Sequence, residues 1–225
     1  MTWVKICGIT NLEDALTAID AGADALGFVF FEKSPRRVTS EAARQIIQKL
    51  PPQIETVGVF VAGSNGDIAE IAEQAHLSSV QMHLPNRKTD SLSGPLSAGR
   101  KHYVAVSASD FFDQDNADFV VFKNGSNAAQ WIHAVFLDSG TAQQPGGTGR
   151  VFDWQKAVAT VERIQRSGLR LVVAGGLTPK NVAEAMRVLK PWGVDVSSGV
   201  EAAPGKKDPE KVRAFIAAVK QADKA

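Results

Sequence analysis

A cysteine and an aspartate, each at the end of a short apolar segment, are the first candidates for chemistry. Cys7 ends the segment WVKIC and is the single cysteine of the chain, and Asp138 ends the segment AVFLD. A thiolate can act as a general base and a carboxylic acid can donate a proton. Lys5 would share the strand face of Cys7, where its positive charge would favour the thiolate. A structural role is the alternative for each, because a lone buried cysteine often packs as a small hydrophobe and an aspartate can cap a turn.

Polar residues end other apolar segments in the same way. In residues 79–83, Gln81 and His83 alternate with Val80 and Met82, so the polar pair and the aliphatic pair face opposite sides of a strand. One such residue alone, such as His83, is commonly a structural hydrogen-bonding group, whereas an inward lysine needs a partner. The polar residues expected on one face near strand ends are Lys5, Cys7, Gln81, His83, Asp138, Asp195 and Ser197. Their gathering on one rim favours a functional site.

Eight segments of this kind run along the chain, with helical periodicity between most of them. They are residues 3–7, 25–30, 55–61, 79–83, 102–106, 134–138, 169–175 and 193–198. This order predicts a (β/α)8 barrel, in which active sites form at the carboxyl ends of the strands. An open doubly wound sheet is the alternative, although no Gly-x-Gly-x-x-Gly follows a strand.

The sequence also predicts the domain organisation and the start of two helices. We expect one domain over residues 1–225, because no linker or low-complexity tract interrupts the pattern. Asn11 is predicted to cap one helix, and Thr178 before Pro179 to cap another. The segment DFVVFKNG looks like a strand where a helix is due, so residues 107–130 are interpreted as an irregular connection.

Three glycine-rich loops follow the later strands and can approach an anion closely. The loops PGGTGR, AGGLTPKN and SSGVE contain Gly147, Gly175 with Gly176, and Ser198 with Gly199. Glycine lets backbone N–H groups point at a phosphate, and the loops after strands seven and eight of this fold commonly bind one. Ordinary tight turns are the alternative, but two such loops at these positions favour a phosphate site.

Composition excludes several classes of protein. With a formal net charge of +1 and 22% charged residues, the chain has no basic stripe for nucleic acid or a membrane surface. One cysteine forms no internal disulfide, the N-terminus lacks a signal-peptide core, and no apolar stretch reaches the roughly 20 residues that cross a bilayer. We therefore expect a cytoplasmic protein. The four histidines show no His-x-x-x-His spacing, and neither a metal site nor a Gly-x-Ser-x-Gly hydrolase motif is indicated.

Several segments spread over almost the whole chain match one family in its own order: KICGITNLEDA, GADALGFVFFEKSPRRV, VGVFV, FLDS, GGTGRVFDW, AGGL and VDVSSGVEAAPGKKD. In these segments the chain resembles the phosphoribosylanthranilate isomerase family of tryptophan biosynthesis. The resemblance implies a (β/α)8 barrel and a cofactor-free Amadori rearrangement of a small phosphosugar. It implies that Cys7 is the general base, Asp138 the general acid and Arg36 a contact for the anthranilate end of the substrate. The residues expected to bind substrate are Lys5, Arg36, Gln81, His83, Gly147, Gly175, Gly176, Asp195, Ser198 and Gly199.

The chain departs from the family pattern in two places. Leu84 follows His83 where the family usually has glycine, which puts the local course of the loop in question, and residues 88–130 match weakly. The family includes monomers, dimers and fusions with indole-glycerol-phosphate synthase. At 225 residues we expect no second barrel, and hence a monofunctional monomer or homodimer.

The expected reaction needs one general acid and one general base, the roles given to Asp138 and Cys7. Opening the ribose ring needs a proton on its oxygen, and the resulting iminium acidifies the C2 hydrogen, which a base then removes. Two rival functions remain. Another phosphosugar isomerase on this scaffold would resemble a two-aspartate design with Asp in place of Cys7, and a non-catalytic phosphate-binding barrel would not need the pair at all.

Overall fold

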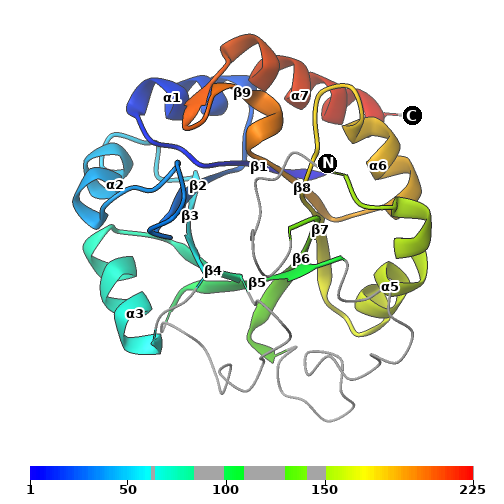
Figure 1. Cartoon of the computed structure of the whole chain (residues 1–225), viewed down its shortest axis with the longest axis horizontal. Helices are drawn as coiled ribbons and strands as arrows, with labels where there is room; N and C mark the ends of the chain where they lie inside the picture. Colours follow the sequence, from blue (N-terminus) through cyan, green and yellow to red (C-terminus); the bar gives the residue numbers. More distant parts are fainter. Residues whose placement is uncertain (62–63, 84–98, 109–129, 141–150, 225) are drawn as a thin grey trace.

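Eight parallel strands close into a barrel in the computed structural model, which describes residues 1–61, 64–83, 99–108, 130–140 and 151–224. Each strand pairs with the next in sequence, and the first pairs with the last, so the sheet has no edge (Figure 1). The strands are β1 (Trp3–Cys7), β2 (Ala25–Val29), β3 (Glu55–Phe60), β4 (Ser79–His83), β5 (Lys101–Ser107), β6 (Ile132–Asp138), β7 (Arg170–Val173) and β8 (Gly193–Val196). The predicted (β/α)8 barrel is confirmed, and the open sheet is excluded.

Helices surround this barrel on its outside (Figure 1). They are α1 (Leu12–Ala21), α2 (Ser40–Ile47), α3 (Asn65–Gln74), α5 (Trp154–Arg166), α6 (Val182–Leu189) and α7 (Pro209–Ala222). A short 3-10 turn, η5 (Ser198–Val200), and a hairpin of β9 (Glu201–Ala203) and β10 (Lys206–Lys207) lie between β8 and α7. None of the helices in the described ranges is long and apolar enough to span a membrane.

The two predicted helix caps have different outcomes. Asn11 accepts a hydrogen bond from the backbone N–H of Asp14 and begins α1, as expected. The prediction for Thr178 was wrong, because α6 begins only at Val182. The Asn181 side chain accepts a hydrogen bond from the Thr178 N–H at 2.7 Å, and residues 178–181 form a turn ahead of the helix.

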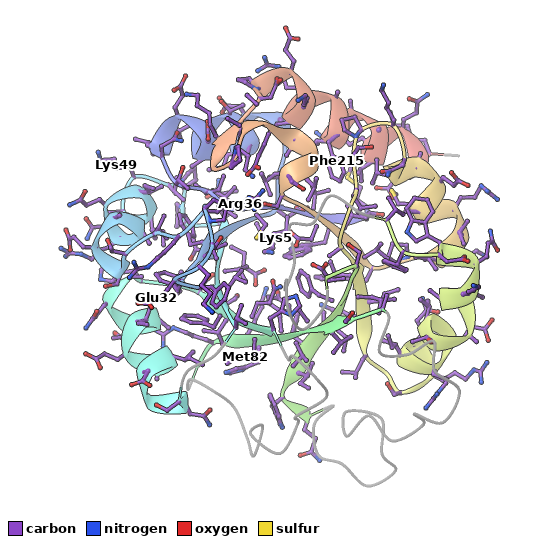
Figure 2. All side chains as sticks on the ribbon, in the orientation of Figure 1. Lys5, Glu32, Arg36, Lys49, Met82 and Phe215 are labelled. Atoms are coloured by element: carbon purple, nitrogen blue, oxygen red, sulfur yellow. The ribbon has the colours of Figure 1, made fainter. Side chains whose placement is uncertain are left out.

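The predicted alternation of strand residues is confirmed by two separate cores. Outward-facing aliphatic residues such as Val4 and Ile6 pack under the helices, together with Phe215 of α7, which points toward the barrel wall (Figure 2). The inner core contains Tyr103 and Phe136, whose ring centroids lie 5.4 Å apart. Because aromatic side chains fill this layer inside the barrel, the polar inward residues near the strand ends collect above it.

Several sequence-based expectations lie outside the described residues. These are the position of Gly147, the effect of Leu84, and most of the irregular connection expected over residues 107–130. The expected last strand is shorter than predicted and ends at Val196, because Ser198 begins the 3-10 turn.

Candidate active site

A buried ion pair forms the floor of the candidate site. The register between β1 and β8 places Lys5 opposite Asp195, and the Lys5 Nζ lies 2.9 Å from the Asp195 Oδ1. Lys5 is fully buried, and its ammonium also lies 5.0 Å from the centroid of the Phe136 ring. Burial alone would lower the pKa of Lys5, but the Asp195 carboxylate outweighs that effect, and the pKa is raised. The inward lysine thus has the partner that its position required.

Cys7 lies two residues further along the same strand face, beside this pair. The thiol is buried, and burial raises its pKa above the usual value, although the positive charges of Lys5 and Lys207 oppose the rise. The expected direction of the Lys5 effect is therefore present, but desolvation is the larger influence. In the free protein Cys7 is mainly a protonated thiol, and it must lose its proton before it can act as a base.

Asp138 approaches from β6, well away from β1 around the barrel. One of its oxygens, Oδ1, accepts a hydrogen bond from the Gly140 N–H at 2.7 Å, and the other, Oδ2, lies 4.0 Å from the His83 Nε2. Gln81 projects from β4 beside His83, and its buried Oε1 accepts no hydrogen bond from any residue in the described ranges. The site therefore also offers an acceptor with unused capacity.

One cavity brings together six of the residues predicted for the site, Cys7, Arg36, Gln81, His83, Asp138 and Asp195. Its lining consists of Cys7, Val29, Phe31, Ser34, Arg36, Val59, Val61, Gln81, His83, Asp138, Asp195 and Ser197. Among the predicted site residues in the described ranges, Lys5, Gly175, Gly176, Ser198 and Gly199 are not part of this lining. Figure 2 shows Lys5 and Arg36 near the centre of the barrel, whereas Glu32 and Lys49 lie toward its periphery. A wider groove of about 870 Å³ runs along α6 and α7, but it contains none of the predicted site residues. The cavity at the strand ends, which contains the residues capable of acid–base chemistry, is therefore the candidate active site.

The glycine-rich loops after β7 and β8 pack against neighbouring loops too closely for side chains. Gly175 and Gly176 have φ angles of 77° and 68°, the left-handed region that favours glycine. A Cβ on Gly175 would lie 2.4 Å from the Ser139 nitrogen, and one on Gly199 would lie 1.8 Å from the Leu177 oxygen. Close approach of backbone to backbone thus accounts for these glycines, and Gly147 in the third loop lies outside the described residues.

Residues without an assignment from sequence also contribute to the site. Arg36 forms a two-pronged ion pair with Glu201, and Glu201 also pairs with the buried Lys207. Both partners lie in the segment VDVSSGVEAAPGKKD, which carries part of the family resemblance, but no role was predicted for either residue from the sequence. The sequence signal available was the need of a partly buried arginine for an anionic partner.

Metal binding was not expected from the sequence. In the part of the chain that the structure describes, no three or more His, Cys, Asp or Glu side chains are arranged to hold a metal ion.

Comparison with known proteins identifies close relatives. A family model described as N-(5'phosphoribosyl)anthranilate (PRA) isomerase matches residues 4–218. N-(5'-phosphoribosyl)anthranilate isomerases are 45% identical in Pelobacter propionicus, over 98% of this chain and 97% of that protein, and 42% identical in Pseudomonas fluorescens, over 96% and 97%.

Solved structures of phosphoribosyl anthranilate isomerases also superpose on this chain. The phosphoribosyl anthranilate isomerase of Thermotoga maritima superposes with a TM-score of 0.79 at 38% identity, covering 98% of this chain and all of that one. A phosphoribosyl anthranilate isomerase in complex with reduced 1-(o-carboxyphenylamino)-1-deoxyribulose 5-phosphate superposes with a TM-score of 0.76 at 38% identity, with the same coverage.

Proposed function

The chain belongs to the phosphoribosylanthranilate isomerase family, and we propose that Cys7 and Asp138 are the general base and general acid of its reaction. As an enzyme of tryptophan biosynthesis, it converts N-(5'-phosphoribosyl)anthranilate into 1-(2-carboxyphenylamino)-1-deoxyribulose 5-phosphate. The observation that supports the two roles is that both side chains line one cavity, from strands well separated around the barrel.

The reaction needs two proton transfers on one small sugar. Asp138 in its acid form donates a proton to the ring oxygen as the C1–O bond breaks, and the nitrogen lone pair forms an iminium. The Cys7 thiolate then removes the C2 proton, which the iminium has made acidic, and the electron pair returns to nitrogen as an enolamine. Tautomerisation of the enolamine gives the ketone, with no net oxidation.

The charges of the site support this assignment of roles. The Gly140 N–H occupies Asp138 Oδ1 and leaves Oδ2 for the transferable proton. The cations Lys5 and Lys207 both favour the thiolate of Cys7, so they reduce the cost of ionising a buried thiol. A second aspartate in place of Cys7 would suit the rival two-aspartate isomerase, and the thiol disfavours that function.

Different residues bind the two charged ends of the substrate, the anthranilate carboxylate and the phosphate. The Arg36 guanidinium, which lines the cavity, binds the anthranilate carboxylate as a charge-assisted pair. Backbone N–H groups around Gly175, Gly176, Ser198 and Gly199 bind the phosphate. The sugar between them contacts the inward residues Lys5, Gln81, His83 and Asp195. Gly147, which lies outside the described residues, is assigned to substrate binding from the sequence alone.

We extend the proposal to the setting of the enzyme. It works in the cytoplasm as one unit over residues 1–225, as a monomer or homodimer, without nucleic acid, membrane or cofactor. The isomerase of Thermotoga maritima is dimeric, and monomers generated from it have been crystallised, which supports both states for this fold.

Turnover of N-(5'-phosphoribosyl)anthranilate by the purified protein tests the proposal. We expect Cys7→Ala and Asp138→Asn each to lower kcat by at least about 100-fold, the low end for general acid–base groups. Affinity for the reduced product analogue should stay roughly unchanged, and the exposed Asp20→Asn serves as the matched control. Survival of kcat in either variant, with native circular dichroism, would exclude that residue from its role.

A further inference from the structure

Glu201 holds two cations at the edge of the candidate active site. Its Oε1 and Oε2 accept hydrogen bonds from the Arg36 Nε and Nη2, both at 2.7 Å. The Lys207 Nζ lies 3.1 Å from the same Oε1, and Lys207 is only 1% exposed. Burial alone would raise the pKa of Glu201, but these two partners outweigh it and hold the pKa below its usual range. The carboxylate is therefore charged at neutral pH.

The hairpin that carries Glu201 is anchored to the barrel on several sides. The Lys207 N–H donates to the Asp14 Oδ2 at 2.7 Å, and the Thr10 hydroxyl donates to the Gly205 carbonyl at 2.5 Å. The Lys211 Nζ of α7 donates to the backbone carbonyl of Glu201 at 2.8 Å. Figure 1 shows β9 beside α1 and α7. The Glu201 carboxylate thus projects from a rigid support.

Arg36 lies in the connection between β2 and α2, and one edge of its guanidinium is fully used by Glu201. A guanidinium presents five N–H donors in a plane, and a carboxylate on the Nε and Nη2 edge leaves the Nη1 side for a second anion. Gly8 leaves room for the aliphatic part of Arg36, since a Cβ at that position would lie 2.6 Å from the Arg36 Cδ. Within the described ranges, Arg36 Nη1 donates no hydrogen bond to the protein.

The charge balance of the cluster favours an anionic ligand. Arg36 and Lys207 are two cations against the single Glu201 carboxylate; burial lowers the pKa of Lys207, and its pairing with Glu201 opposes that shift. Without Lys207, the Arg36–Glu201 pair would be neutral and would attract a carboxylate less. The second lysine therefore keeps Arg36 attractive to substrate while Glu201 fixes its orientation.

We propose that Glu201 is a positioning residue that orients Arg36 for recognition of the aromatic carboxylate of the substrate, with Lys207 restoring the positive charge that Glu201 neutralises. This inference rests on the proposed role of Arg36. It assigns a function to the hairpin after β8, which contacts Arg36 and the start of α1 but supplies neither the proposed acid nor the proposed base.

A double-mutant cycle between Glu201→Gln and Arg36→Met tests the proposal. Two probes are used, the reduced 1-(2-carboxyphenylamino)-1-deoxyribulose 5-phosphate and its phenylamino counterpart without the carboxylate. We expect Glu201→Gln to raise KM and the Kd of the carboxylated probe at least about tenfold, the equivalent of one charge-assisted hydrogen bond, with kcat within about threefold. The Kd of the phenylamino probe should change little, and in the Arg36→Met background Glu201→Gln should have almost no further effect.

Controls separate this role from a merely structural one. Glu201→Gln leaves the buried Lys207 without a charged partner, which could destabilise the fold. A second variant, Glu201→Gln with Lys207→Met, removes the lysine charge as well and still leaves Arg36 without its carboxylate partner. It should show the same selective loss for the carboxylated probe. Glu41→Gln, which removes the exposed partner of Arg44, should leave both probes unaffected.

Each outcome bears on a different claim. Equal losses for the two probes, or an unchanged KM, in a folded Glu201 variant would overturn the positioning role. The positioning role would also be overturned if Glu201→Gln weakened binding of the carboxylated probe as much in the Arg36→Met background as in the wild type. Arg36→Met that binds both probes like the wild type would instead refute the role of Arg36, and wild-type protein without turnover would refute the proposed function.

Discussion

Replacing Lys5 with methionine tests how far the candidate site depends on its buried ion pair. Methionine fills a similar volume but removes the ammonium 2.9 Å from the Asp195 carboxylate. Asp195 is only 8% exposed, so water can replace little of the interaction with the lysine. The variant therefore leaves a buried carboxylate without its cation.

The expected cost follows from that geometry. Removing one partner of a buried ion pair costs about 3–5 kcal/mol, a large part of the roughly 5–15 kcal/mol that holds a folded protein together. At a urea dependence of about 3 kcal/mol/M, the midpoint of unfolding should fall by about 1–1.7 M. Lys5→Met with Asp195→Asn removes both charges and should recover at least half of the loss.

Urea unfolding followed by circular dichroism at pH 7.5 measures these values. The pKa of Lys5 is raised in the folded protein, so the pair stabilises the fold below the unfolded pKa of lysine and is fully formed at this pH. Lys206→Met on the exposed face of β10 is the matched control and should stay within about 0.5 kcal/mol. A cost below about 1 kcal/mol for Lys5→Met, or a double variant as unstable as the single one, would refute the reasoning.

Two further predictions concern the base and the phosphate. Because burial raises the pKa of Cys7 above its ordinary value, the rate of its alkylation by iodoacetamide should rise about tenfold per pH unit from pH 7, with no plateau near neutral pH; a plateau near pH 7 would contradict it. Gly176 has a φ of 68°, which Asp and Asn both tolerate better than most residues, so Gly176→Asp should raise KM at least about tenfold relative to Gly176→Asn by repelling the phosphate. Equal KM values in steady-state assays would place the phosphate elsewhere.

Much of the fold is determined locally and could be predicted from sequence. Alternation of polar and aliphatic residues depends only on the geometry of an extended chain, so the inward set from Lys5 to Asp195 was identified without coordinates. Eight strands separated by helical patterns leave few topologies, since parallel neighbours need crossover connections. The site cavity at the strand ends follows from that topology.

Other features depend on residues far apart in sequence, and only the tertiary structure decides them. Lys5 meets Asp195 across 190 positions because β1 pairs with β8, and Arg36 meets Glu201 across 165. No local pattern encodes either partner. The start of α6 at Val182 is likewise seen only in the structure, where residues 178–181 form a turn and the Asn181 side chain accepts the Thr178 N–H.

The direction in which the pKa of Cys7 shifts could not be predicted from its position in the sequence. The neighbouring lysine indicated a lowered pKa, and its charge does act in that direction. The net shift depends on how completely the closed barrel removes water from the thiol, and on the pairing of Lys5 with Asp195. Desolvation is a property of the assembled barrel, whereas the identity and facing of each side chain are properties of its strand.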